Sequence, residues 1–192
     1  MVLKKIISTS QIKRCSQLLS SEDFKNKLIT FIVNHWKCNR DSLKRKELYV
    51  NDRAKTWRFT DSSTELVPDL HSNQEEADTR LILHAKHASV TCNDVIISSP
   101  DTDVFVIALS QLEHINANLY MMTGTGDNKR VIDLKAVANE TNERLNHNNC
   151  SQELYLKAVL GFHCFTGCDS TSSFSGRGKN KPLEILGKKE DT

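Results

Sequence analysis

Two neighbouring segments, QEEADTRLILHAKHA (residues 74–88) and VIISSPDTDVFVIA (residues 95–108), contain the patterns that most constrain the architecture of this chain. The first places apolar residues at helical spacing behind a group of acids, so we expect a helix over about 75–89. The second begins with a continuous apolar run that ends at Pro100. Such a run is typical of a central parallel strand that is covered on both faces.

Strand and helix patterns alternate along the rest of the chain. Alternation of this kind predicts an α/β fold with a largely parallel sheet. In that architecture, ligands bind beyond the carboxyl ends of the strands, where Asp101 and Asp103 follow the strand over 94–99. We expect helices over 22–36 (with Ser21 as N-cap), 103–112, 134–146 and 151–165, strands over 47–51, 56–60 and 118–124, a strand or turn over 130–134, and a loop over 61–73.

Composition favours an intracellular protein. The six cysteines include no CxxC pair and no zinc-finger spacing, so reduced thiols inside a cell are expected. The first residues lack the apolar core of a signal peptide, and no window approaches the roughly 18 apolar residues of a membrane span.

Charge is unevenly distributed, although the net charge is only +2. Residues 1–58 contain 14 Lys/Arg against 5 Asp/Glu, whereas residues 59–128 contain 2 against 11. An acidic middle beside a basic section fits a cation site next to a bound polyanion. A solvated basic helix followed by an unrelated acidic surface explains the charges more simply, so charge alone does not favour the site.

Five carboxylates form the candidate site. Magnesium prefers oxygen ligands and usually keeps several waters. Taken singly, each acid is more simply a capping residue: Glu76 and Asp78 in a first helical turn, Asp101 as an N-cap, and Asp169 in an Asx-turn. Taken together, the five acids favour a metal site: Glu76, Asp78, Asp101, Asp103 and Asp169.

Four motifs resemble those of the flap-endonuclease/XPG-type 5′ nucleases, a branch of the PIN-like nucleases. EEADTR is similar to the family's Glu-Ala-Glu-Ala motif at a helix start, and PDTDV to its Asp-x-Asp pair after a central strand. GCDS is similar to its Gly-Cys-Asp motif, and GRGKNKPLEIL to its helix-hairpin. The motifs keep the family's order over residues 74–187. The pattern EEADTR…SPDTDV…FTGCDS resembles still more closely a group of uncharacterised animal proteins linked to mobile elements.

The resemblance implies a PIN-like three-layer fold with a central mostly parallel sheet, followed by a C-terminal helix-hairpin. Residues 1–46 would be an N-terminal helical segment, 47–168 the PIN-like core with the acidic site, and 169–192 the start of the helix-hairpin region. The family's two upstream aspartates have no convincing match. Asp52 follows a strand but lies only 24 residues before Glu76, so we interpret it as a turn residue and expect an N-terminally incomplete nuclease core.

The resemblance also implies Mg²⁺- or Mn²⁺-dependent hydrolysis of phosphodiester bonds, with two cation sites in the complete family. The implied catalytic residues and metal ligands are Glu76, Asp78 and Asp101 in a first group, and Asp103 and Asp169 in a second. The implied nucleic-acid contacts are Gly176, Arg177, Gly178, Lys179 and Lys181, through backbone N–H groups and positive charge.

Three functions follow from these expectations. The first is a nuclease-like domain acting on nucleic acid, with DNA favoured over RNA and the nucleus over the cytoplasm. The second is a catalytically inactive nucleic-acid-binding remnant that lacks the upstream ligands. The third is a protein-interaction module. Zinc is not expected, because no standard zinc spacing connects His84, His87, His163, Cys164 and Cys168, which we interpret as partly buried polar or surface residues.

Overall fold

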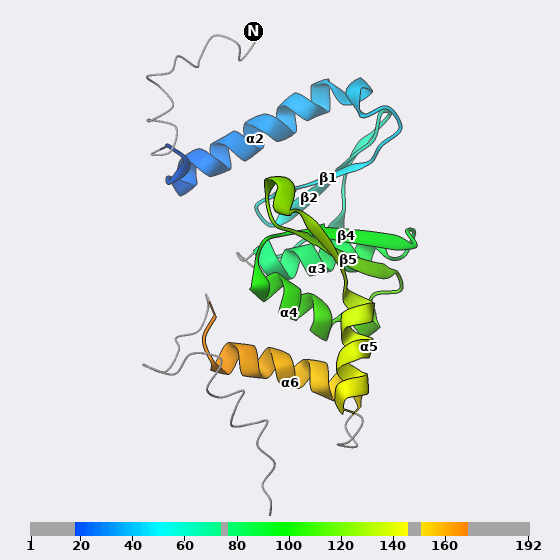
Figure 1. Cartoon of the computed structure of the whole chain (residues 1–192). Helices are drawn as coiled ribbons and strands as arrows, with labels where there is room; N and C mark the ends of the chain where they lie inside the picture. Colours follow the sequence, from blue (N-terminus) through cyan, green and yellow to red (C-terminus); the bar gives the residue numbers. More distant parts are fainter. Residues whose placement is uncertain (1–17, 74–76, 146–150, 169–192) are drawn as a thin grey trace, which may run out of the picture. The chain divides into compact units, whose positions relative to one another are not determined.

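The computed structural model describes residues 18–73, 77–145 and 151–168. The chain forms two compact units, Met1–Glu75 and Glu76–Thr192, each with its own three-stranded sheet (Figure 1). The division therefore falls directly before the acidic helix of the candidate site, whereas the sequence analysis placed its boundaries after residues 46 and 168. No described helix is both long and apolar enough to cross a bilayer.

The first unit combines a long helix with an antiparallel sheet of order β1-β2-β3. The predicted N-cap is confirmed, because the Ser21 hydroxyl accepts a hydrogen bond from the N–H of Phe24 at 3.4 Å. The predicted strands over 47–51 and 56–60 are confirmed as β1 and β2, which pair antiparallel, while β3 lies in the segment predicted as loop. The elements are α2 (Glu22–Cys38), η2 (Arg40–Leu43), β1 (Leu48–Asp52), β2 (Lys55–Phe59), β3 (Thr64–Leu66) and η3 (Pro68–Leu70).

Aromatic side chains join α2 to this sheet. Phe59 is fully buried, and the Trp36 ring meets it edge-on with 6.1 Å between ring centroids. The ammonium of Lys37 lies 3.6 Å from the centroid of the Trp57 ring. Edge-to-face and cation–π contacts of this kind each contribute about 1 kcal/mol, so α2 and β2 form the small core of the first unit.

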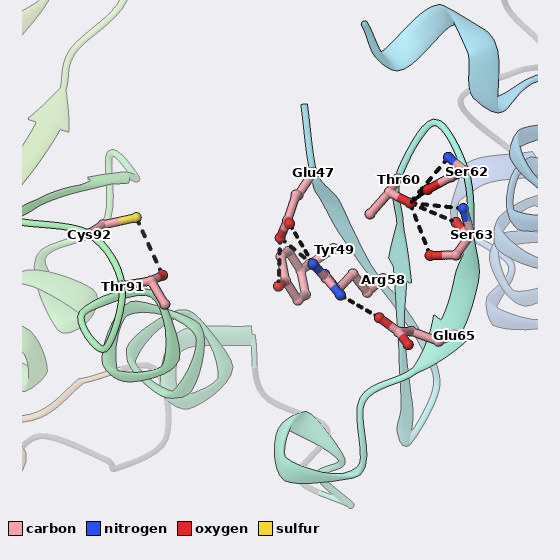
Figure 2. Close-up of polar contacts among 9 residues, drawn as sticks. All are labelled: Glu47, Tyr49, Arg58, Thr60, Ser62, Ser63, Glu65, Thr91 and Cys92. Atoms are coloured by element: carbon pink, nitrogen blue, oxygen red, sulfur yellow. Dashed lines mark hydrogen bonds and ion pairs between the residues drawn. The ribbon is translucent and has the colours of Figure 1, made fainter. Parts of the chain in front are cut away.

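A charged ladder crosses the other face of β2. Arg58 lies between Glu47 and Glu65 and forms an ion pair with each, and the Tyr49 hydroxyl donates to Glu47 at 3.0 Å (Figure 2). The Arg58 Nε–H also donates to Glu47 at 3.0 Å. These side chains remain accessible to solvent, and exposed ion pairs contribute little to stability. The ladder therefore serves mainly to align three strands.

The second unit contains the β-α-β crossover that positions the candidate site. Its sheet has the order β4-β5-β6, with β4 parallel to β5 and β6 antiparallel to β5. Helices α3, α4 and α5 lie on one side of the sheet, and α6 packs against α4 (Figure 1). The elements are α3 (Ala77–Ala88), β4 (Asp94–Ser98), α4 (Thr102–Ser110), η4 (Leu112–His114), β5 (Asn118–Thr123), η5 (Gly126–Asn128), β6 (Arg130–Asp133), α5 (Leu134–Leu145) and α6 (Gln152–Phe165).

One continuous core lies between the helices and the sheet of the second unit. Leu119 on β5 and Val104 on α4 are fully buried, as is Leu134 at the start of α5. Burying a side chain of this size stabilises the fold by roughly 1.5–3 kcal/mol. The loop between β4 and α4 is therefore held between two well-packed elements.

The predicted PIN-like three-layer fold with a central mostly parallel sheet is wrong. The described residues form an α/β structure with two small sheets of three strands, one antiparallel and one mixed. The hairpin around η5 turns β6 back antiparallel to β5, and Gly124 permits this turn with a φ of +84°. The predicted helix-hairpin falls within residues 169–192, outside the described residues.

The interpretation of β4 as a central strand covered on both faces is also wrong. β4 is an edge strand, and its residues alternate between buried and exposed. Val95 and Ile97 face the core, whereas Ile96 is 60% exposed. An apolar run in the sequence does not distinguish one covered face from two, because Ile and Val are favoured in either kind of strand.

Candidate functional site

Asp101 lies at the carboxyl end of β4, where the chain turns into α4. Ser99 continues the parallel pairing for one residue, with its N–H donating to the carbonyl of Met122 at 3.1 Å. The Ser99 hydroxyl then accepts a hydrogen bond from the Asp101 N–H at 3.1 Å. Pro100 prevents the strand from continuing as a ladder. The Ser-Pro-Asp sequence thus fixes a carboxylate at the edge where α/β folds bind ligands.

The side chain of Asp101 is the N-cap of α4, as the sequence predicts. Its Oδ1 accepts a hydrogen bond from the Asp103 N–H at 2.9 Å. Among the described residues, the structure shows no partner for the other oxygen, Oδ2, and the residue is partly exposed. Asp101 can therefore cap the helix with one oxygen and present the other to a cation.

Asp103, one residue into α4, contacts a histidine from α6. The His163 Nε2–H donates to Oδ1 of Asp103 at 2.7 Å, across 60 residues of sequence. The side chains are 14% and 9% exposed, respectively, so the pair is largely removed from water. A buried histidine and a buried carboxylate each require such a partner. The contact fixes the orientation of the Asp103 carboxylate and holds the end of α6 against α4.

The end of α6 carries two thiols beside this pair. Cys164 lies in the last turn of α6, and Cys168 follows the end of that helix. Local desolvation of the Cys164 sulfur raises its pKa, and Cys168 and the negative Asp103 raise it further. Cys164 is nevertheless an exposed residue.

Asp78 lies in the first turn of α3, where the helix dipole favours an acid. Helix α3 packs against α4, and Asp78 is partly buried. The remaining predicted ligands, Glu76 and Asp169, lie outside the described residues. So do the predicted nucleic-acid contacts at 176–181.

The structure thus brings together part of the predicted site. The Asp101 carboxylate contacts the backbone N–H of Asp103, and both residues follow the carboxyl end of β4. Within residues 18–73, 77–145 and 151–168, no group of three or more His, Cys, Asp or Glu side chains is arranged to hold a metal ion. The described acids at this edge are therefore two residues close in sequence, Asp101 and Asp103, rather than a complete two-metal set.

The role of His163 was not predicted from the sequence. The sequence does contain an indication of this role, because His163 is an ionisable residue in the largely apolar helix pattern LKAVLGFHCF. A histidine buried at such a position needs a polar partner. The sequence alone could not identify that partner. For His84 on α3, burial lowers the pKa most, and repulsion from Arg80 and His87 lowers it further.

Comparison with models of protein families, with curated proteins and with solved structures finds no match to this chain.

Proposed function

We propose that this chain is a metal-dependent nuclease-like domain that hydrolyses phosphodiester bonds of nucleic acid. The observation that carries the proposal is the position of Asp101. It lies where a parallel strand ends and a helix begins, with one carboxylate oxygen engaged as the cap and the other directed to no described partner. The proposal rests on this local arrangement and on the four motifs, not on the size of the sheet.

Two adjacent carboxylates fit one Mg²⁺ or Mn²⁺, which typically binds one or two carboxylates and completes its coordination with waters and substrate phosphate. Asp101 and Asp103 would supply those carboxylates, with Glu76, Asp78 and Asp169 as further ligands. When bound, the cation activates water and offsets the charge that develops on the phosphate.

His163 acts in this proposal as a positioning residue. Its hydrogen bond at 2.7 Å holds one oxygen of Asp103 in place, as residues behind a metal ligand commonly do. The N-terminus of α4 contributes as well, because its partial positive charge reduces the cost of holding two acids together.

Nucleic acid is the proposed partner, with DNA favoured over RNA and the nucleus over the cytoplasm. Gly176, Arg177, Gly178, Lys179 and Lys181 would contact the phosphate backbone without reading sequence. Such contacts weaken as salt rises, because binding releases counterions.

A second candidate is a nucleic-acid-binding remnant without turnover. One observation favours it: the two described acids at the sheet edge already cap α4 and contact His163, and the described part of the chain contains no three-ligand group. Both candidates predict nucleic-acid binding, and only the first predicts cleavage.

Cleavage of a labelled 5′-flap DNA by the full chain, with Mg²⁺ or Mn²⁺, separates the candidates. Asp101→Asn is the informative variant, because asparagine caps a helix as well as aspartate does but lacks the negative charge. Asp23→Asn, on the exposed first turn of α2, is the matched control. We expect metal-dependent cleavage that Asp101→Asn reduces about a hundredfold or more and the control retains.

Two other results would count against the first candidate. Salt-sensitive binding without cleavage would favour the remnant. If the chain neither binds nor cleaves nucleic acid, that result would contradict both candidates.

A further inference from the structure

A tight turn with two left-handed residues joins η2 to β1 in the first unit. The Lys46 N–H donates to the Leu43 carbonyl at 2.9 Å, so residues 43–46 form a β-turn. Its central residues, Lys44 and Arg45, have φ values of 47° and 67°. Positive φ at both central positions is the type I′ turn, in which Asn-Gly is a favoured pair. A left-handed backbone brings a Cβ atom close to the following carbonyl oxygen, so Lys44 and Arg45 are held in an unfavourable conformation.

A basic residue is also left-handed at the next turn. Among the described residues, three other than glycine have a positive φ, and the third is Arg53, at 54°, between β1 and β2. All three are basic, and all belong to the first unit. Turn chemistry alone favours Gly, Asn or Asp at such positions. Basic side chains that occupy them at a conformational cost indicate a function, because strained residues cluster at functional sites.

The turn over 43–46 concentrates positive charge. Residues 40–46 contain four Lys/Arg and one Asp. Residues 44–46 are three consecutive exposed cations. Glu47, the acid that follows them, forms an ion pair with Arg58 (Figure 2). Adjacent like charges repel one another, and a bound polyanion relieves that repulsion.

Contacts on both sides hold the turn in place. At the end of α2, the Asn39 side chain donates to the His35 carbonyl at 2.8 Å. Arg40 Nη1 donates to the Thr64 hydroxyl on β3 at 3.3 Å. On the other side of the turn, β1 pairs with β2 along its whole length. The cations therefore project from a fixed backbone, which lowers the conformational entropy lost when a ligand binds.

An extended polyanion fits this arrangement better than a small phosphate. β1 spans five residues, or about 17 Å, and the two basic turns lie beyond its opposite ends. A single phosphate cannot contact both turns, whereas the phosphates of a nucleic acid repeat along its backbone. No exposed large apolar side chain lies within residues 39–55, all of which the structure describes. The segment therefore lacks the apolar residues that insert into a bilayer.

We propose that Lys44, Arg45 and Lys46 form a contact site for the phosphate backbone of a nucleic acid, with Arg53 as a second contact. Such contacts position the nucleic acid without reading its sequence. The inference rests on the proposed nucleic-acid partner. It assigns a new contact to the first unit, separate from the acidic site of the second unit and from residues 176–181.

Replacement of the turn by its favoured sequence tests the proposal. Lys44→Asn/Arg45→Gly keeps the turn and removes two charges. Binding of the full chain to a fluorescein-labelled 5′-flap DNA is followed by anisotropy in EDTA, which prevents metal-dependent cleavage. We expect the dissociation constant to rise about tenfold or more, and the slope of log K against log salt to become shallower by about 2. Lys46→Gln leaves the left-handed positions unchanged and should reduce the slope by about 1.

Tryptophan fluorescence shows whether each variant folds, because Trp36 and Trp57 both belong to the first unit. Asn-Gly relieves the strain, so the urea midpoint of Lys44→Asn/Arg45→Gly should rise while its affinity for DNA falls. A merely structural role of the turn would move stability and binding in the same direction. A midpoint that does not rise would contradict the strain from which the function is inferred.

Lys25→Gln/Lys27→Gln, on the exposed face of α2, removes the same charge and is the matched control. The proposal is overturned if the turn variant and this control weaken binding equally, or if the turn variant binds as the unmodified chain does. In that last case the nucleic-acid partner remains and only the turn is excluded, whereas absence of DNA binding by the unmodified chain would refute both. Preferential binding to phosphatidylserine vesicles over DNA would also refute a nucleic-acid site.

Discussion

Separate and combined replacement of Asp103 and His163 by alanine measures how strongly their contact couples α4 to α6. The two side chains approach to 2.7 Å and are only 14% and 9% exposed. A hydrogen bond to a charged group contributes about 1.5–3 kcal/mol when water competes weakly. We therefore expect a coupling free energy of about 2 kcal/mol in the double-mutant cycle.

An exposed pair in the same chain provides the control. Lys27 and Asp23 approach to 2.6 Å on α2, yet both side chains are 74% exposed. An exposed pair four residues apart on a helix typically contributes about 0.3–0.5 kcal/mol. The two cycles thus compare separations of 2.7 and 2.6 Å at different burial, and we expect the coupling free energy of the buried pair to be several times larger.

Hydrogen exchange of the α4 and α6 amides is the appropriate assay. Both tryptophans, Trp36 and Trp57, belong to the first unit, so tryptophan fluorescence does not report on the second. Two compact units need not unfold together, and exchange measures local opening free energies segment by segment. Additive effects of Asp103→Ala and His163→Ala, within about 0.5 kcal/mol, would refute the inference that this contact joins the helices.

Three further predictions concern the second unit. Gly124→Ala should destabilise this unit by more than about 1 kcal/mol, because the new Cβ would lie 2.2 Å from the Asn128 carbonyl oxygen at a φ of +84°. Gly161→Ala on α6, where a Cβ meets nothing within 4 Å, should instead stabilise the unit by about 0.5–1 kcal/mol. Urea unfolding followed by circular dichroism compares the stabilities of the two variants. Ser151→Ala should cost about 1 kcal/mol, since the Ser151 hydroxyl accepts from the Leu154 N–H at 3.3 Å, and faster exchange confined to the first turn of α6 would be its signature. Burial, Arg80 and His87 lower the pKa of His84 below 6.5 in the folded state, so the unfolded chain binds more protons and the free energy of unfolding should fall as pH drops below about 6.5; an unchanged slope in His84→Gln would show that another group is responsible.

Local signals in the sequence predicted most of the elements. Ser21 and Asp101 are N-caps in the structure, as the sequence predicted. The strands β1 and β2 were also predicted, because two short strand-forming runs flank polar residues. These features depend on residues within a few positions of one another, which a single sequence displays directly.

The errors arose where distant residues determine the outcome. β3 has only three residues and lies just before Pro68, so the sequence pattern predicts a loop there, although β3 pairs with β2 in the structure. The exposure of Ile96 depends on which strands lie beside β4, and the sequence does not state that. The contact between Asp103 and His163 joins residues 60 apart. Pairing, edge position and long-range contacts are tertiary properties, and local propensity does not encode them.

Binding of Mn²⁺ by the full chain, followed by electron paramagnetic resonance, examines the Asp101 carboxylate without requiring turnover. We expect saturable binding that Asp101→Asn weakens about tenfold or more, while Asp23→Asn binds as the unmodified chain does. Absence of saturable binding, or equal binding by Asp101→Asn, would contradict the proposed cation site at the end of β4.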